Sequence, residues 1–486
     1  MTNPSDIPTH THHIQEINQR DNATFDVLSA TNGQVIAKVG VSSTEHAEFA
    51  LSQCDALFKN RDRWLSLEAR VGILERMVGI METRREELAK TIALEGGKPL
   101  SDANVEADRA IQGVRKSIEA LSSEAGYVVP MGMYANSAKR MAFTQKEPIG
   151  VVLAISAFNH PLNLIVHQVG AAIAAGCPCI VKPAANTPLS CIAFYDIAIE
   201  AGLPNAWLHV VTAENHDVAS LLVKDKRIGF LTFIGSARVG WMIKNQVHDG
   251  VRCALEHGGV APVIVTNNAN LTEASASITK GGYYHAGQVC VSTQRVFVDS
   301  QVAEAFIEQL TAHVKALTTG DASDPDTDVG PLIRPSEVNR VEEWVNEAID
   351  AGAIVSTGGK RINDHFFEPT LLINPPAHVK VSTHEVFGPV VCIYTYNTID
   401  QAIAQANSLD VAFQAAVFSN DINECLHCYR HLAASAVMVN DHSAFREDNM
   451  PFQGLRSSGL STGGIKHTIE EMQIDKLMVI KSDSLL

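Results

Sequence analysis

The sequence predicts an α/β protein built on parallel sheets, and three observations support this class. Short apolar runs without polar alternation recur along the chain, as in strands that are buried on both faces. Segments with apolar residues at helical spacing separate these runs. Glycine or proline stands where such segments end, as at Gly176 and Pro178. In sheets of this kind, ligands bind beyond the carboxyl ends of the strands.

In chain order, residues 65–95 come first, and their apolar side chains at helical spacing predict an amphipathic helical layer. Residues 126–145 lose that spacing and are more typical of a pair of extended segments. The alternating part follows. We expect strands over 149–155, 179–181, 207–211, 228–234 and 253–256, with helices over 162–175 and 190–201.

A second α/β block is expected from about residue 260 to residue 455. It should contain a helix over 271–286, a strand over 295–298 and further alternation through 390–418. Residues beyond about 470 predict a late strand, which could pair with segment 126–145 or with a partner chain. A chain of 486 residues with 46% hydrophobic and 19% charged residues should form two or three globular domains.

Composition excludes several classes of function. A formal net charge of −16 without a basic run argues against a nucleic-acid partner. The first residues show no secretory signal, and the most apolar stretch, 162–181, is interrupted by polar side chains, so we expect a cytoplasmic protein without a membrane span. Nine irregularly spaced cysteines favour free thiols over disulfides, and they predict no metal site.

Cys290, in the segment Gly287-Gln288-Val289-Cys290, is a candidate nucleophile. Oxidation of an aldehyde to an acid suits a thiolate, which adds to the carbonyl carbon and later leaves easily. A cysteine taken alone is more often a buried structural residue.

Glu256 and Asn159 each follow a predicted strand. The Glu256 carboxylate could take a proton from the thiol or from a water that hydrolyses a thioester. The Asn159 amide and the backbone N–H of Cys290 could donate to a developing oxyanion. Taken alone, Glu256 would be a surface or capping residue and Asn159 a turn residue.

Two further strand ends offer places for a dinucleotide. Gly235 and Ser236 follow a strand and begin a helix, which suits a pyrophosphate at a helix N-terminus, although the usual GxGxxG spacing is absent. Lys182 ends another strand and could reach ribose hydroxyls, or it could simply be a solvated lysine.

Taken together, these segments resemble the ordered motif set of the aldehyde dehydrogenase superfamily. The resemblance covers nearly the whole chain and rests on the following motifs: FNHPLN (158–163), VKPA (181–184), FIGS (233–236), LEHGG (255–259), GQVC (287–290), EVFGPV (385–390) and PFQGLRSSG (451–459). It implies NAD(P)-dependent oxidation of an aldehyde to a carboxylic acid through a hemithioacetal and a thioester.

The resemblance also assigns roles to residues. It implies that Cys290 is the nucleophile, Glu256 the general base and Asn159 part of the oxyanion hole. For the cofactor, NAD or NADP, the implied contacts are as follows: Lys182 to the adenosine ribose, Gly235 and Ser236 to the pyrophosphate, Glu385 to the nicotinamide ribose, and Phe387 beside the nicotinamide ring.

Three positions depart from the usual family motifs. Ala185 stands where many members carry a glutamate that binds both ribose hydroxyls and repels a 2′-phosphate, so NADP use stays open. Phe158 replaces a common tryptophan in the pocket wall. His257 follows the proposed base, where we expect it to alter the pKa of Glu256.

The resemblance further implies an architecture. It places a Rossmann-like dinucleotide-binding domain at 1–124 and 148–258, an α/β catalytic domain at 259–455, and small oligomerisation strands at 125–147 and 470–486. Members are usually homodimers or homotetramers.

The substrate is predicted to be a small polar or anionic aldehyde. The FNHPLN form resembles the branch that acts on lactaldehyde, glyceraldehyde 3-phosphate and phosphonoacetaldehyde, and His160, Arg446 and Arg115 are candidate substrate contacts. Members of that branch with anionic substrates place an arginine before the catalytic cysteine, where this chain has Val289.

Two alternatives stay open. A CoA-acylating semialdehyde dehydrogenase would generally lack the base that Glu256 represents, and a catalytically silent relative with a structural or binding role would be expected to lose Cys290, Glu256 or Asn159.

Overall fold

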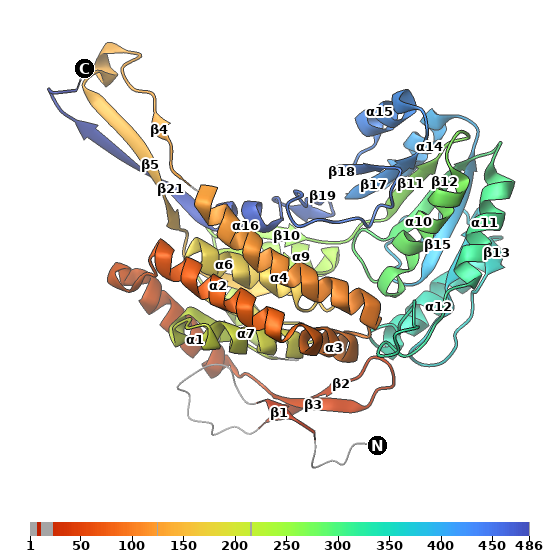
Figure 1. Cartoon of the computed structure of the whole chain (residues 1–486), viewed down its shortest axis with the longest axis horizontal. Helices are drawn as coiled ribbons and strands as arrows, with labels where there is room; N and C mark the ends of the chain where they lie inside the picture. Colours follow the sequence, from red (N-terminus) through yellow and green to blue (C-terminus); the bar gives the residue numbers. More distant parts are fainter. Residues whose placement is uncertain (1–6, 11–22, 124, 214–215, 486) are drawn as a thin grey trace.

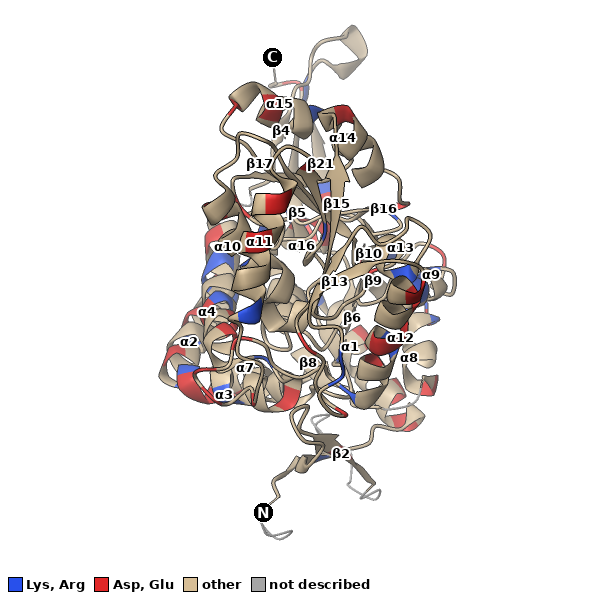
Figure 2. Ribbon diagram, turned by 90° about the vertical axis from the view of Figure 1, so that its right-hand side faces the viewer, with Lys and Arg blue, Asp and Glu red and all other residues tan. Residues whose placement is uncertain are grey.

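The computed structural model describes residues 7–10, 23–123, 125–213 and 216–485. Figure 1 shows two lobes and a ribbon of strands that projects away from both. One lobe holds most of the N-terminal half of the chain, and the other holds the segment from α10 (Leu271–Tyr283) to α15 (Ile422–His431). In Figure 2, acidic and basic residues are interspersed along outer helices such as α12 (Pro335–Asp350).

The first lobe is built on a six-stranded sheet whose strands are parallel except for one edge strand. In sheet order the strands are β20 (Gly459–Leu460), β10 (Arg252–Glu256), β9 (Ile228–Ile234), β6 (Val151–Ile155), β7 (Cys179–Lys182) and β8 (Leu208–Val210). All residues of β6 are buried, and they alternate between two apolar clusters, one on each face of the sheet. The parallel sheet predicted from uninterrupted apolar runs is therefore confirmed.

Helices cover both faces of this sheet. One face packs against α2 (Leu67–Thr83), α3 (Arg85–Gly96), α4 (Leu100–Ser123), the helical segment 163–175 and α7 (Leu189–Glu200). The other face packs against α1 (Thr44–Lys59), α8 (Asp217–Val223) and α9 (Ala237–Lys244). The predicted helical layer over 65–95 consists of two helices, because the helical backbone is interrupted at Arg84, between α2 and α3.

The second lobe contains a seven-stranded sheet. Its order is β13 (Ile354–Thr357), β14 (Thr370–Ile373), β15 (Val390–Tyr396), β12 (Thr293–Asp299), β11 (Ala261–Val265), β17 (Gln414–Phe418) and β18 (Ala436–Val439). Helix α10 was expected to reach residue 286, but it ends at Tyr283. His285 and Ala286 take φ of 48° and 54°, and these left-handed angles do not continue an α-helix.

The projecting ribbon joins two distant parts of the sequence. β21 (Gln473–Lys481) pairs antiparallel with β5 (Arg140–Pro148) along its whole length, and β4 (Val128–Val129) lies on the other side of β5. The expected pairing of the late strand with segment 126–145 is thus confirmed. Among the described residues, no helix is long and apolar enough to cross a membrane.

Candidate active site

A cleft of about 810 Å³ lies between the two lobes and receives side chains from both. Every predicted site residue except Lys182 and Arg115 lines it. The predicted residues on its walls are Asn159, His160, Gly235, Ser236, Glu256, Cys290, Glu385, Phe387 and Arg446. The turns after β6, β9 and β10 supply one wall, as expected for the carboxyl ends of parallel strands.

Cys290 lies in the loop before β12. It is half-buried, whereas every other cysteine in the chain is buried. Burial, followed by the nearby carboxylates of Glu256 and Glu385, raises the pKa of the Cys290 thiol well above its usual value. The thiol is therefore protonated at neutral pH in this structure, and it needs a proton acceptor before it can act as a nucleophile.

Glu256 is the last residue of β10, which lies between β9 and β20. Burial raises the pKa of its carboxyl to about 7, and the charge of Arg446 opposes that rise. Both protonation states are therefore populated near neutral pH, as a general base requires.

Asn159 lies in the turn after β6, and its Nδ2 donates to the carbonyl oxygen of Gln288 at 2.9 Å. This bond ties the amide to the backbone just before Cys290. The turn itself is held by Glu106 on α4, whose Oε1 accepts from the backbone N–H groups of Leu162 at 2.9 Å and Asn163 at 3.1 Å. The other oxygen of Glu106 pairs with Lys98, and both side chains are fully buried.

The cofactor side of the cleft begins at the end of β9. The N–H of Gly235 donates to the carbonyl oxygen of Glu256 at 3.0 Å, and Ser236 follows as the N-cap residue of α9. The Ser236 side chain makes no capping hydrogen bond and is exposed, so both it and the helix N-terminus are available to an anion.

Glu385 and Phe387 face this wall from the second lobe. Oε1 of Glu385 is buried and accepts no hydrogen bond from any described residue, and burial raises the pKa of the carboxyl to about 8. A Cβ on Gly258 would lie 1.8 Å from that oxygen, so only glycine lets the backbone come this close. Phe387 meets Phe158 edge to face, with ring centroids 5.8 Å apart. A ribose hydroxyl fits beside the Glu385 oxygen, and a flat ring fits beside Phe387.

Lys182 ends β7 but does not line the cleft, whereas Ala184, two residues later, does. Burial lowers the pKa of the Lys182 amine. An adenosine ribose would therefore have to meet Lys182 at the margin of the cleft.

Arg446 reaches the cleft from the loop before β19 (Leu455–Arg456). Its Nη1 donates to the carbonyl oxygen of Met450 at 2.5 Å, and its guanidinium lies over the ring of Phe452 at 4.5 Å. Nη2 is buried without a hydrogen-bond partner among the described residues. Burial lowers the pKa of Arg446 to about 10, which still leaves it charged at neutral pH.

The prediction for Arg115 is wrong. Arg115 pairs with Glu82 on α2, and its side chain is 38% exposed. A residue that the sequence analysis missed, Arg109 on the same helix, lines the cleft and pairs with Asp448 at 2.7 Å. The i, i+4, i+7 spacing of Asp102, Glu106 and Arg109 is the signal that could have found it.

His160 and His167 complete this end of the cleft. Nε2 of His160 lies 3.3 Å from the hydroxyl of Tyr284, and burial holds the pKa of His160 well below its usual value, so the ring is neutral. His167 bonds to Asp448 at 2.9 Å. Burial alone would raise the pKa of Asp448, but His167 and Arg109 outweigh it and hold that pKa below its usual range.

His257 does not act on Glu256 as expected. Its ring packs between Phe233 and Trp241, and its Nδ1 lies 3.0 Å from the carbonyl oxygen of Ser457. Burial and Arg446 are the causes that set the pKa of Glu256.

Comparisons with known proteins agree with this geometry. The profile of the aldehyde dehydrogenase family matches residues 17–478. The chain is 36% identical over 457 residues to the 3-sulfolactaldehyde dehydrogenase of Priestia aryabhattai, a match that covers 94% of each chain.

Two solved structures share the whole fold. Aldehyde dehydrogenase 21 from Physcomitrella patens, in complex with the reaction product succinate, has a TM-score of 0.94 and 31% identity, covering 99% of this chain and 100% of that chain. A glyceraldehyde-3-phosphate dehydrogenase from Methanocaldococcus jannaschii, complexed with NADP, has a TM-score of 0.90 and 34% identity, covering 95% and 100%. The chain therefore belongs to the aldehyde dehydrogenase family and is an NAD(P)-dependent aldehyde dehydrogenase.

Proposed function

We propose that this enzyme oxidises short anionic aldehydes to carboxylic acids, with Cys290 as nucleophile, Glu256 as general base and Asn159 in the oxyanion hole. The observation that carries the proposal is that these three residues line one cleft together with Arg446. Arg446 is a half-buried cation whose Nη2 is buried without a hydrogen-bond partner among the described residues.

In the first half-reaction, the Cys290 sulfur bonds to the aldehyde carbon after its proton has passed to a base. The Asn159 amide and the Cys290 backbone N–H donate to the oxygen that becomes negative. NAD(P)⁺ held in this cleft would supply the hydride acceptor for this carbon, and a thioester on Cys290 would remain. The raised pKa of the thiol supports a base-dependent start to this sequence.

In the second half-reaction, Glu256 takes a proton from a water that attacks the thioester carbon. The C–S bond then breaks, Cys290 leaves with the bonding electrons as a thiolate, and the acid is released. A carboxyl with a pKa of about 7 suits this proton transfer. The presence of Glu256 in the cleft favours hydrolysis over transfer to CoA, and the presence of all three residues disfavours a silent relative.

For the cofactor, we propose that residues 1–124 and 148–258 form its binding domain, with residues 259–455 as the catalytic domain. Gly235 and Ser236 would hold the pyrophosphate, Glu385 the nicotinamide ribose and Phe387 the ring. Lys182 would reach the adenosine ribose from the end of β7. The unpaired oxygen of Glu385 supports the ribose contact.

For the substrate, Arg446 and Arg109 place two guanidinium groups at this end of the cleft. The neutral ring of His160 can accept a hydrogen bond from a hydroxyl or donate one to it. Asp448 already neutralises Arg109, which leaves Arg446 as the main contact for an anion. One relative is named for 3-sulfolactaldehyde, and another was crystallised with succinate. Both molecules carry an acidic group on a short carbon chain, which supports this substrate class.

A test compares Arg446→Gln with the wild-type enzyme on a three- or four-carbon aldehyde that ends in a carboxylate or sulfonate, and on a neutral aldehyde of equal length. KM for the anionic substrate should rise by about tenfold or more, while KM for the neutral substrate changes little, because one charge-assisted hydrogen bond is worth about 1.5–3 kcal/mol. Cys290→Ala should show no burst of NAD(P)H on either substrate. Hexanal or benzaldehyde as the best substrate of the wild-type enzyme would contradict the substrate class.

We also propose that the chain forms a homodimer through its strand edges. β21 and β18 end their sheets, and Leu477 and Val479 on β21 are half exposed. Unpaired edges with apolar side chains favour pairing with another chain.

A further inference from the structure

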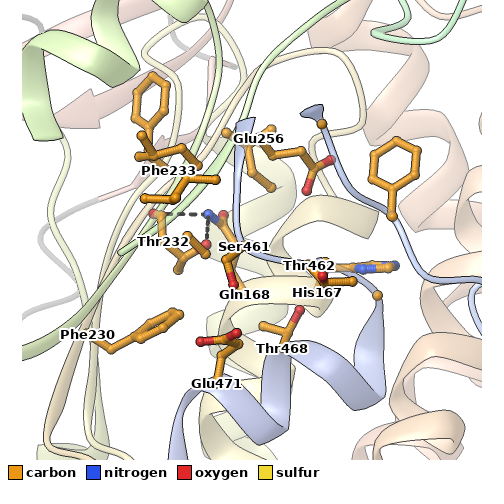
Figure 3. Close-up of a pocket in the computed structure, with 18 residues that line it drawn as sticks. His167, Gln168, Phe230, Thr232, Phe233, Glu256, Ser461, Thr462, Thr468 and Glu471 are labelled. Carbon is orange, nitrogen blue, oxygen red and sulfur yellow. Dashed lines mark hydrogen bonds between the residues drawn. The ribbon is translucent and has the colours of Figure 1, made fainter. Parts of the chain in front are cut away.

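A second, smaller cavity lies behind Glu256, on the inner side of the first sheet. Its volume is about 30 Å³. Besides Glu256, its polar lining consists of the following residues: His167, Gln168, Thr232, Ser461, Thr462, Thr468 and Glu471. Glu256 lines both this cavity and the large cleft. In Figure 3, Glu256 and Glu471 lie at opposite ends of the group of labelled polar side chains.

Two buried oxygens of this lining have no hydrogen-bond partner among the described residues, Oε1 of Gln168 and Oγ of Ser461. The Gln168 amide is fixed because its Nε2 donates to the carbonyl oxygen of Ile155 and to both oxygens of Thr232. Buried polar atoms of this kind are usually satisfied by ordered water. A water needs about 10–15 Å³ of such space, so a cavity of about 30 Å³ has room for two or three.

Gly463 keeps this space open beside the carboxyl group. A Cβ at this position would lie 3.3 Å from Oε2 of Glu256. The Gly463 backbone cannot retreat, because its N–H donates to the carbonyl oxygen of Phe452 at 2.6 Å and its own carbonyl accepts from Phe452 at 2.9 Å.

The proposed reaction leaves a proton on Glu256 in each turnover. Substrate and cofactor fill the cleft on one side of this carboxyl group while the thioester is hydrolysed. The proton must leave before Glu256 can act again, and the cavity on the other side is polar.

We propose that the cavity behind Glu256 holds a short water chain that carries its proton to Glu471 on α16 (Ile465–Glu471), and from there to solvent. The Glu256 carboxylic acid gives its proton to the first water, that water or the next gives one to the Glu471 carboxylate, and Glu471 passes it to bulk water. Gln168, Ser461 and Thr468 position the waters. The inference rests on the proposed role of Glu256 as general base.

The experiment compares Glu471→Gln with Glu470→Gln, a neighbouring carboxylate on α16 that does not line the cavity. Stopped-flow measurements with a short anionic aldehyde give the NAD(P)H burst and the slower steady state. In Glu471→Gln the burst should stay at wild-type amplitude while steady-state turnover falls about tenfold, less than the roughly 10²–10⁴-fold typical of losing a general base. Its solvent deuterium isotope effect should increase, and imidazole buffer should restore turnover in proportion to its concentration. Glu470→Gln should match the wild-type enzyme.

A second variant tests the cavity itself. Ser461→Ala removes one unpaired hydroxyl without placing a β-branched side chain at the left-handed backbone position of residue 461, whose φ is 72°. It should reproduce the slower turnover and larger isotope effect, with thermal melting used to confirm that it folds. Wild-type turnover and isotope effect in both Glu471→Gln and Ser461→Ala would overturn the proton path. Glu256→Gln is measured in parallel. Rapid hydrolysis in Glu256→Gln would contradict the proposed function itself, because Glu256 would not be the general base. If Glu256→Gln loses hydrolysis while the cavity variants keep it, only the proton path is refuted.

Discussion

At the scale of single residues, Cys290 and Glu256 are both acids whose pKa values are raised by the same burial. The thiol loses the ability to ionise unaided, while the carboxyl becomes a stronger base at neutral pH. The same desolvation thus weakens one group for its proposed role and suits the other, and Arg446 moderates both because its positive charge favours their ionised forms.

This arrangement predicts a pH dependence. Glu256 is an effective base only when deprotonated, so thioester hydrolysis should rise as pH increases through about 7 and then level off. Arg446→Gln should move the midpoint to higher pH, because removing a cation raises the pKa of a nearby carboxyl. Turnover under saturating substrate, measured from pH 5.5 to 9, checks this, and an unchanged midpoint in Arg446→Gln would count against the coupling.

Ala185 predicts cofactor selectivity at the same scale. It is half-buried and packs with the N-terminal strands, close to the end of β7 where the adenosine ribose is proposed to bind. Ala185→Glu should reduce kcat/KM for NADP relative to NAD by about tenfold or more, because like charges 4 Å apart repel by about 4 kcal/mol at an effective dielectric of ~20. Ala185→Gln, of equal size without charge, should shift the ratio much less. Equal effects of both variants would show that size rather than charge decides.

At the scale of elements, α4 connects the helical layer to the active site through Glu106. Its carboxylate satisfies the first N–H groups of the segment that follows Asn159, and it neutralises the buried Lys98. Without such an acceptor, the first backbone N–H groups of a helix have no hydrogen-bond partner within the helix.

Removing this carboxylate should therefore cost both stability and turnover. Glu106→Leu leaves Lys98 buried and unpaired, with an expected loss of about 3–5 kcal/mol. The double variant Lys98→Met with Glu106→Leu should regain most of the stability, since no lone charge remains, but not the turnover, because the Asn159 turn still lacks its acceptor. Denaturation midpoints and kcat of the three proteins test this, and equal recovery of both quantities would contradict a positioning role.

Elements also show where sequence patterns succeed. The strands and helices of the first lobe follow from uninterrupted apolar runs, because burial on both faces leaves a clear signature in composition. The end of α10 was missed because His285 and Ala286 take left-handed backbone angles that their residue types do not favour. Arg115 was named and Arg109 was missed, although Arg109 shares a helical face with Asp102 and Glu106; tertiary packing brings that arginine to the cleft.

At the scale of the whole molecule, the sequence could predict that the cleft lies at the loops after the parallel strands, but it could not predict the shape of the cleft. Family motifs pointed to Cys290, Glu256 and Asn159 because each lies in a local pattern, and all three line the cleft. The cluster of Arg109, His167 and Asp448 joins three distant segments, each of which looks ordinary by itself, so no local pattern shows their contact.

Assembly is the remaining prediction at this scale. If the edge of β21 pairs with another chain, the double variant Leu477→Lys with Val479→Lys should shift the protein to monomer in light scattering and lower its melting temperature, because charges on an edge strand oppose strand pairing. Ile354→Lys, on the exposed edge strand β13, serves as the control and should leave the assembly unchanged. A monomeric wild-type protein would refute the dimer outright.

The segment 446–464 links recognition to chemistry. It carries Arg446 and the Phe452 ring at its start, adds β20 beside Glu256, and ends at Gly463 against the carboxyl group of Glu256. A mutation that reshapes this segment for a new aldehyde will therefore also disturb hydrolysis. Descendants of this enzyme should diversify their substrates more readily at His160, whose ring lies against Tyr284 and His285, outside this segment, and libraries for directed evolution should start there.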